Sequence, residues 1–342
     1  MKKYNVVVIG VGVVGIEMLR VLRQRNFPIG ELRVFARSAR DISVDTERYS
    51  VKPISPEGFE GIDIALFAGT EGEKGAAVTY AAEAVKRGAV VIDNGADFRM
   101  DPQVPLVVPE VNAKDVKKRK KGIIANPNCS TIQMVVALWP IYKQAGIRRI
   151  VVTTLQASSG AGKAAVEQLR QENSLIAAGD FRYLHAKVDD KVLPQQLAYN
   201  VFPHIGSFTD CDYTNEEWKL VKETHKIMHD DKIKISATTV RVPVRTGHSE
   251  AVYIETARPI TPEKVRGILS KSPGVKVLDD PKNNLYPMPK DAEGKDDTFV
   301  GRIRKDPFVK NGLWLWVVAD NLRKGAATNA VQIAECVISE SK

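Results

Sequence analysis

The sequence predicts an α/β protein in which an N-terminal Rossmann-like dinucleotide-binding domain precedes a second, α+β domain. Four observations support this. Strand and helix patterns alternate through the first 126 residues, and a glycine-rich loop separates the first strand from the first helix. Beyond residue 126 long strand patterns dominate. A chain of 342 residues also exceeds the size at which a single core stops growing, which favours two domains.

The first domain is expected to contain a parallel sheet. Short apolar runs bounded by turn residues predict its strands at 5–9, 32–36, 62–67, 89–93 and 122–126. Helical spacing of apolar residues predicts helices at 16–25 and 76–88. Alternation of strand and helix implies parallel strands joined by crossovers.

The second domain is expected to hold a mixed or antiparallel sheet with few helices between its strands. Its strand patterns lie at 150–156, 234–244, 251–257, 299–305 and 313–319. The last segment, 325–342, is an amphipathic helix that we expect to return to the first domain. The predicted domains are therefore 1–126 with 325–342, which bind the dinucleotide, and 127–324.

Composition narrows the class of protein. Apolar residues make up 44% and charged residues 27%, as in ordinary globular chains, and the formal charge of +9 favours anionic partners. The basic run 117–121 carries no interleaved aromatic residue, so we interpret it as a solvated loop and expect no nucleic-acid partner. No segment has the pattern of a signal peptide or membrane span.

The three cysteines, Cys129, Cys211 and Cys336, lack the spacing of a disulfide framework or a metal site. We therefore expect reduced thiols, no bound metal and a cytoplasmic location.

The glycine-rich loop predicts the cofactor site. It reads Gly10-Val11-Gly12-Val13-Val14-Gly15, between a strand and a helix, where such a loop cradles a pyrophosphate. The helix N-terminus would add amide donors and a positive dipole. At the end of the second strand, Arg37 and Ser38 stand where an NAD site normally has an acidic residue, so NADP is predicted.

Cys129 is the candidate nucleophile. It lies in Asn126-Pro127-Asn128-Cys129-Ser130-Thr131, after a strand and before a helix, where the helix N-terminus would stabilise a thiolate. A lone intracellular cysteine is commonly inert and buried. These residues alone leave both interpretations open.

Several separate blocks resemble the aspartate-semialdehyde dehydrogenase family over nearly the whole chain. They are NPNCST (126–131), LQASSGAG (155–162), EEWKLVKET (216–224), RVPVRTGHSEAV (241–252), FVGRIRKDP (299–307) and LWVVADNLRKGAA (315–327). The resemblance implies the NADP-linked, phosphate-dependent interconversion of L-aspartate 4-semialdehyde and L-4-aspartyl phosphate through a cysteine thioacyl intermediate. It also implies a role in making lysine, threonine and methionine, and a homodimer or a dimer-based tetramer. By the same resemblance, 127–324 would be the domain for catalysis and dimerisation.

The resemblance also assigns residues to the reaction. Cys129 would be the nucleophile, His248 the acid/base, and Gln156 the residue that orients the acyl intermediate. Arg241 would hold the substrate α-carboxylate through its guanidinium fork. Arg245, four residues further along the same predicted strand, would share its face and is a second substrate contact.

Further contacts follow from the same resemblance. Glu216 would accept a hydrogen bond from the substrate ammonium. Without the resemblance, Glu216 and Lys219 would be interpreted as a surface ion pair. They lie at the start of a predicted helix, which Thr214 and Glu217 mark as a possible capping box. Phosphate contacts are implied for Lys219, Arg99 and Asn128. Cofactor contacts are implied for Ser159, Gly160 and Asn321.

Two alternatives remain at this point. An N-acetyl-glutamyl-phosphate reductase would share the architecture and the cysteine, but its motif usually has glycine where Asn128 stands. A catalytically silent dinucleotide-binding relative would have no chemical need for Cys129, Gln156, Arg241 and His248 together.

Overall fold

The computed structural model describes residues 2–69, 75–179 and 192–340, which form two compact units. Unit 1 comprises Met1–Ile132, Lys226–His229 and Leu322–Lys342. Unit 2 comprises Gln133–His225 and Asp230–Asn321. Unit 1 thus extends six residues beyond the expected boundary at 126 and gains a short segment from the middle of the chain.

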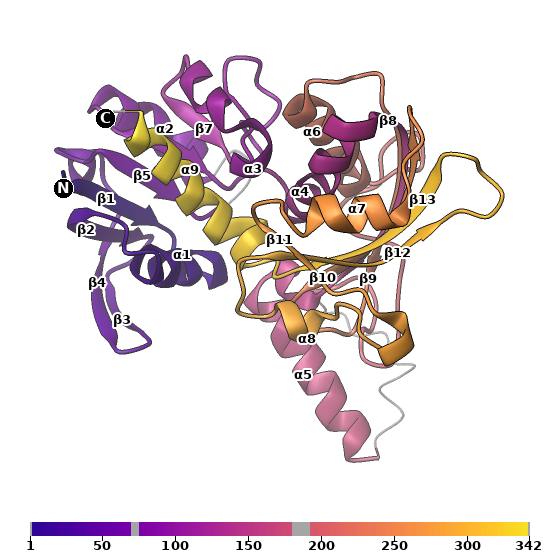
Figure 1. Cartoon of the computed structure of the whole chain (residues 1–342). Coiled ribbons are helices and arrows are strands. Elements are labelled where there is room, and N and C mark those ends of the chain that lie inside the picture. Colours follow the sequence, from indigo (N-terminus) through magenta and orange to yellow (C-terminus); the bar gives the residue numbers. More distant parts are fainter. Residues whose placement is uncertain (1, 70–74, 180–191, 341–342) are drawn as a thin grey trace. The chain divides into compact units, whose positions relative to one another are not determined.

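Unit 1 is built on a seven-stranded sheet with the order β3-β4-β2-β1-β5-β6-β7 (Figure 1). Neighbouring strands are parallel except for β3 and β4, which pair antiparallel at one edge. The strands are β1 (Tyr4–Ile9), β2 (Ile29–Ala36), β3 (Arg40–Val44), β4 (Glu47–Pro53), β5 (Ile64–Phe67), β6 (Val90–Asp93) and β7 (Ile123–Ala125). The predicted Rossmann-like α/β architecture is confirmed.

All five strands predicted for the first domain are present, but β3 and β4 were not expected. Residues 40–53 are largely exposed and charged, because this hairpin lies at the sheet edge and buries few side chains. Such a segment lacks the apolar run that marks a central strand. Its polar character suits an edge that must not pair with other chains.

The helices of unit 1 are α1 (Val13–Gln24), α2 (Ala76–Lys86), α3 (Pro109–Asn112) and α9 (Thr328–Ser339). The C-terminal helix α9 lies beside α1 (Figure 1), and its Ala330, Ile333 and Ala334 belong to the same buried cluster as Val6 and Leu19. The end of the chain therefore completes the core that the beginning of the chain starts.

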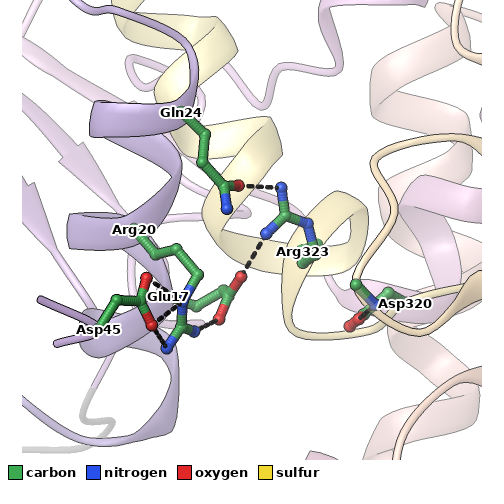
Figure 2. A network of polar contacts seen from close by, with 7 residues as sticks. Glu17, Arg20, Gln24, Asp45, Asp320 and Arg323 are labelled. Carbon is green, nitrogen blue, oxygen red and sulfur yellow. Dashed lines mark hydrogen bonds and ion pairs between the residues drawn. The ribbon is translucent and has the colours of Figure 1, made fainter.

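An ion-pair network links α1 to the π-helical turn before α9 (Figure 2). Arg323 donates to Glu17 at 2.6 Å and to Gln24 at 2.8 Å. Glu17 also pairs with Arg20, which in turn contacts Asp45 at 3.0 Å. Because Glu17 and Arg323 are both buried, losing either would leave a charge without its partner in the interior.

Unit 2 contains a six-stranded mixed sheet with the order β11-β12-β13-β10-β8-β9 (Figure 1). The central pairs are antiparallel, whereas β8–β9 and β11–β12 are parallel. The strands are β8 (Ile147–Gln156), β9 (Lys234–Arg241), β10 (His248–Thr256), β11 (Val275–Val277), β12 (Thr298–Lys305) and β13 (Gly312–Ala319). The expectation of a mixed sheet is confirmed.

Unit 2 has more helix between its strands than expected. Its helices are α5 (Lys163–Ala177), α7 (Pro262–Leu269) and α8 (Pro289–Ala292), and most of α4 (Cys129–Ala145) and α6 (Asn215–Met228) also lies there. The sequence analysis missed α5, although its buried Ala165, Leu169, Glu172 and Ile176 recur at helical spacing. Its mostly polar composition hides that stripe.

The basic run 117–121 is only partly a solvated loop. Lys118 pairs with Asp115, and Arg119 pairs with Glu340 at 2.8 Å. Lys121 contacts a further carboxylate, Asp101. These ion pairs compensate much of the positive charge of the run. Within the described ranges, no helix combines the length and apolar character that crossing a bilayer requires.

Candidate active site

In unit 2, three predicted site residues meet at one edge of the sheet. Gln156 ends β8 and is in register with Arg241, which ends the parallel strand β9. His248 begins β10, which runs antiparallel to β8, so its first residue lies at the same edge. All three side chains are buried. The topology thus gathers residues that are up to 92 positions apart in the sequence.

The ring of His248 is held by the backbone. The amide of Ala157 donates to Nδ1 at 3.0 Å, so the proton of the neutral imidazole resides on Nε2. Burial, and secondarily the charge of Arg241, hold the pKa of His248 well below its ordinary value. Within the described part of the chain, no group hydrogen-bonds Nε2. The ring therefore presents an N–H donor and is neutral near pH 7.

Gly160 keeps space open beside this ring. A Cβ atom at this position would lie 3.1 Å from Nε2 of His248 and 3.3 Å from Nη1 of Arg241. Both contacts are tighter than normal packing, so any side chain here would press on the two groups. A glycine is needed at this position so that the backbone can approach them closely.

Arg241 is fixed by the same residue that holds His248. Its Nη1 donates to the carbonyl oxygen of Ala157 at 2.7 Å, and only 4% of the residue is exposed. A buried guanidinium held at one end is suited to binding a carboxylate through its fork. Ala157 thus positions a base and a cation through its backbone alone, a role that its side chain does not signal in the sequence.

Arg245 does not share the face of Arg241, and that expectation was wrong. Strand β9 ends at Arg241, and Pro243 cannot donate a ladder hydrogen bond, so the chain turns away before Arg245. The side chain of Arg245 is exposed and pairs with Glu293. The geometry gives Arg245 a surface ion pair.

Gln156 connects the sheet edge to helix α6. Its Nε2 donates to Glu216 Oε1 at 3.3 Å, and Lys219 donates to Glu216 Oε2 at 3.2 Å. Glu216 is buried, so this pair is not an ordinary surface contact. The predicted capping box is confirmed, because Thr214 and Glu217 exchange hydrogen bonds of 2.8 and 3.2 Å at the helix start.

Ser159 and Asn321 form a buried pair beside the histidine strand. Asn321 Nδ2 lies 2.9 Å from the Ser159 hydroxyl, and Asn321 Oδ1 accepts from the amide of Gly247 at 2.9 Å. The pair therefore fixes the residue that precedes His248.

Two buried residues near His248 were missed by the sequence analysis. Glu250 lies in β10, and burial raises the pKa of its carboxyl well above the ordinary value, an effect that the amide of Gln133 opposes. Gln133 also approaches the carbonyl oxygen of His248 at 3.5 Å. The signal in the sequence was a glutamate, Glu250, within the strand 248–256, since acidic residues are rarely buried without a partner.

In unit 1, Cys129 is the first residue of α4, as predicted, and directly follows the strand β7 and its turn. Asn128 caps the helix, since its Oδ1 accepts from the amides of Ser130 and Thr131 at 3.0 and 3.3 Å. The thiol is therefore held at a defined helix N-terminus. Asn128 has a structural role here besides the phosphate contact implied for it.

Arg99 emerges near the same sheet edge, because β6 and β7 are parallel neighbours and the amide of Asn126 donates to Asp93 at 2.7 Å. The Arg99 side chain is buried and donates to the carbonyl of Asn94 at 2.8 Å. Lys226 donates to the carbonyl oxygen of Arg99 and to two further carbonyls. This cationic side chain fixes the loop that carries Arg99.

The glycine loop has the close packing that dinucleotide binding requires. Gly10 has φ +98°, and a Cβ atom on Gly15 would lie 1.8 Å from the carbonyl oxygen of Gly10. Among the residues that the structure describes, no atom lies within 4 Å of a Cβ on Gly12, the residue before α1, and no side chain caps this helix. The open space beside uncapped helix amides fits a pyrophosphate.

Arg37 and Ser38 follow β2 and are exposed. Arg40, which the sequence analysis did not single out, donates to the Ser38 hydroxyl at 3.2 Å. Arg37 directly follows β2 and Arg40 begins β3, and two arginines so placed are chemically suited to a 2′-phosphate. Within the described ranges, no three histidine, cysteine or acidic side chains cluster as metal ligands.

Comparison with known proteins gives consistent matches. Residues 5–119 match the family described as semialdehyde dehydrogenase, NAD binding domain, and residues 138–324 match semialdehyde dehydrogenase, dimerisation domain. An aspartate-semialdehyde dehydrogenase of Aquifex aeolicus is 54% identical over 98% of both chains.

Two solved structures add to these matches. Aspartate semialdehyde dehydrogenase II of Vibrio cholerae, complexed with ASA, has 43% identity, 99% coverage of both chains and a TM-score of 0.92. The Candida albicans enzyme, solved with NADP, has 25% identity, 99% coverage of both chains and a TM-score of 0.75.

Proposed function

Because this chain belongs to the aspartate-semialdehyde dehydrogenase family and is such an enzyme, we propose that it interconverts L-aspartate 4-semialdehyde and L-4-aspartyl phosphate with NADP and phosphate. One observation carries the proposal. Arg241, Gln156 and His248 are brought to one buried sheet edge, where a cation, an amide and an N–H donor are all available to a small polar substrate.

We propose that the thiolate of Cys129 attacks the acyl phosphate in the reductive direction and releases phosphate. The product of this step is a thioester on Cys129. After reduction, the thiohemiacetal collapses to the aldehyde and frees the thiolate. The position of Cys129 at the start of α4 supports this role, since a helix N-terminus stabilises negative charge on sulfur.

His248 is proposed as the acid/base. Its neutral ring carries the proton on Nε2, so it can donate a hydrogen bond to the oxygen on which negative charge develops. To pass a proton to that oxygen the ring would first take up a proton and become imidazolium, because loss of the Nε2 proton from the neutral ring would leave an imidazolate. Gln156 directly follows Leu155, which pairs with Ser249, the residue after His248. We propose that its amide orients the acyl group.

The substrate contacts follow from charge. Arg241 is proposed to bind the α-carboxylate, and Glu216 to accept from the α-ammonium. Lys219, Arg99 and Asn128 are proposed to contact phosphate, because two cations and an amide would stabilise the departing dianion. Arg245 receives no support from its surroundings for its proposed contact.

NADP is the proposed cofactor: when bound, its reduced form would supply a hydride in the reductive direction and its oxidised form would accept one in the reverse direction. The residues proposed to hold its pyrophosphate are Gly10, Gly12, Val13, Val14 and Gly15. Arg37, Ser38 and Arg40 would bind the 2′-phosphate. Ser159, Gly160 and Asn321 are proposed as further cofactor contacts.

We further propose that the enzyme is a homodimer or a dimer-based tetramer that works in the cytoplasm in the synthesis of lysine, threonine and methionine. The match to a dimerisation domain supports the assembly, and three free cysteines support a reducing location.

A spectrophotometric assay of NADPH formation tests the proposal. We expect turnover only when aspartate semialdehyde, phosphate and NADP are all present. N-acetyl-glutamate semialdehyde serves as the competing substrate. A higher kcat/KM with that compound, or turnover without phosphate, would contradict the proposed reaction.

A further inference from the structure

A second concave site lies in unit 2, at the opposite ends of the strands that carry the catalytic residues. It is a cleft of about 740 Å³ between the end of α4, the start of β8 and β9, and the end of β10. Its lining residues are Tyr142, Lys143, Gly146, Ile147, Arg148, Arg149, Asp230, Lys232, Lys234, Glu255, Ala257 and Arg258. We call it the basic cleft.

The basic cleft is separate from the end of the sheet where Gln156, Arg241 and His248 lie. Arg149 lies seven residues before Gln156 along β8, which corresponds to about 23 Å of extended strand. Lys234 begins β9, whereas Arg241 ends it. A ligand in the cleft would therefore not touch the residues proposed to bind the substrate in this unit.

Six of the lining residues are basic and two are acidic. Both carboxylates already accept hydrogen bonds: Asp230 from the Tyr142 hydroxyl at 2.8 Å and the Lys232 amide at 3.0 Å, and Glu255 from the Tyr253 hydroxyl at 3.4 Å. The cleft therefore has a large excess of positive charge, and its few carboxylates are held by neutral donors.

Four of the cations are not neutralised by ion pairs. In the portion of the chain that the structure describes, no carboxylate pairs with Arg148, Arg149, Lys232 or Lys234. This differs from arginines elsewhere on the surface, such as Arg33 and Arg266, which each contact a carboxylate at 2.7 Å.

The fold also forces these charges together. Arg149 and Lys234 are direct neighbours in the β8–β9 register, where like charges repel, and Glu255 is the only acidic neighbour that the registers of β8 give Arg149, on the β10 side. Arg258 is anchored by a hydrogen bond of 2.9 Å to the carbonyl of Gln144, and Lys143 lies over the ring of Trp139 at 5.6 Å. The cations are thus arranged before any ligand arrives, and an anion would relieve their repulsion.

We propose that the basic cleft binds a compact polyphosphate anion, such as inorganic tripolyphosphate or the triphosphate group of a nucleotide. Several adjacent negative charges can contact cations from three chain segments at once and neutralise more of them than a single orthophosphate can. The volume of the cleft lies within the range of small-ligand sites. The interaction is largely electrostatic and weakens as salt rises.

Calorimetric titration of the complete, assembled enzyme at low ionic strength tests this proposal. We expect tripolyphosphate to bind at least about tenfold more tightly than orthophosphate. The double variant Arg149→Gln/Lys234→Gln should weaken tripolyphosphate binding at least about tenfold, because two of the converging cations are lost. Its kcat/KM for aspartate semialdehyde should be unchanged.

The matched control is Lys271→Gln/Lys282→Gln, which removes the same charge from exposed positions of unit 2 outside the cleft. This control should bind tripolyphosphate as the parent does. If tripolyphosphate binding weakens equally in both double variants, the loss reflects net charge alone and the proposal is overturned. Unchanged tripolyphosphate binding in Arg149→Gln/Lys234→Gln would also overturn it.

Titration with ATP distinguishes the two sources of the anion. Binding of ATP at least about tenfold tighter than tripolyphosphate, with the same loss in the cleft variant, assigns the site to a nucleotide. Equal or weaker binding of ATP assigns it to inorganic polyphosphate.

Discussion

The backbone amide of Ala157 donates a hydrogen bond of 3.0 Å to Nδ1 of His248, and this contact determines which ring nitrogen carries the proton. The carbonyl of Ala157 accepts from Arg241 in turn. One residue with a methyl side chain therefore sets both the tautomer of the proposed acid/base and the position of the proposed carboxylate ligand. No substitution at Ala157 that preserves the backbone should change either hydrogen bond directly.

Cys129→Ala should abolish turnover, because the nucleophile is lost while the fold around the helix start is retained. NADP binding, measured by fluorescence titration, should remain, since the glycine loop is untouched. Cys211→Ala and Cys336→Ala are the controls and should stay active. Measurable turnover by Cys129→Ala would exclude a covalent route through this thiol.

His248→Ala should lower kcat by about 10²- to 10⁴-fold, the range typical of losing a general acid/base. Cofactor affinity should change much less, because the ring is not proposed to contact NADP. Steady-state kinetics combined with equilibrium binding measures both quantities. If KM alone rises, His248 is a binding residue and does not exchange protons with the intermediate.

Arg241→Lys should reduce kcat/KM at least about tenfold, or roughly 1.4 kcal/mol of transition-state stabilisation. Lysine keeps the charge but loses the fork and the hold on Ala157. Arg245→Lys is the matched control and should be milder, since its side chain is exposed beside Glu293. Greater damage in Arg245→Lys would refute the assignment of the carboxylate ligand.

Arg37→Asp should lower the ratio of kcat/KM with NADP to kcat/KM with NAD, because a carboxylate would repel the 2′-phosphate and could bind free ribose hydroxyls. Ser38→Ala and Arg40→Gln should lower the same ratio by smaller amounts, since neither introduces repulsion. The parent enzyme should prefer NADP. Equal use of both cofactors by the parent would remove the basis for the prediction.

Glu250→Gln should stabilise the protein at neutral pH. The folded-state pKa of Glu250 is raised by burial, so the unfolded chain releases its proton at lower pH than the folded chain does. Its stability contribution is therefore fully present below the unfolded value of about 4.3 and is lost as pH rises through the folded pKa.

The test of the Glu250 prediction is the free energy of unfolding in urea at two pH values. At pH 7 the variant should be more stable than the parent by on the order of 1 kcal/mol, and near pH 4 the difference should shrink. Ser249→Ala, at the neighbouring position, controls for disturbance of the strand. A difference that does not depend on pH would show that ionisation of Glu250 is not its cause.

The sequence predicted the parts of the fold that show themselves as apolar runs and glycine turns. Every central strand of unit 1 was found in this way, whereas the edge strands β3 and β4 were missed because they bury almost nothing. Helix α5 was not predicted because its stripe of buried residues is narrow and is interrupted by polar residues such as Glu172.

The candidate site was predicted only where side chains carry chemistry. Cys129 at a helix start follows from local pattern, and its position at the start of α4 is confirmed. The convergence of Gln156, Arg241 and His248 needed the strand register, which no local pattern gives. The contribution of Ala157 is made by backbone atoms, so no residue type could reveal it.

The docking of α9 into the first core has a consequence for synthesis of the chain. During translation, residues 1–132 leave the ribosome long before α9 does, yet Val331 and Ile333 fill the same buried cluster as Val6 and Met18. The core of unit 1 therefore cannot be completed until α9 has been synthesised. Until then Glu17 also lacks its ion-pair partner Arg323. Nascent chains stalled ahead of α9 should be digested by protease in unit 1, and release of the full-length chain should restore resistance.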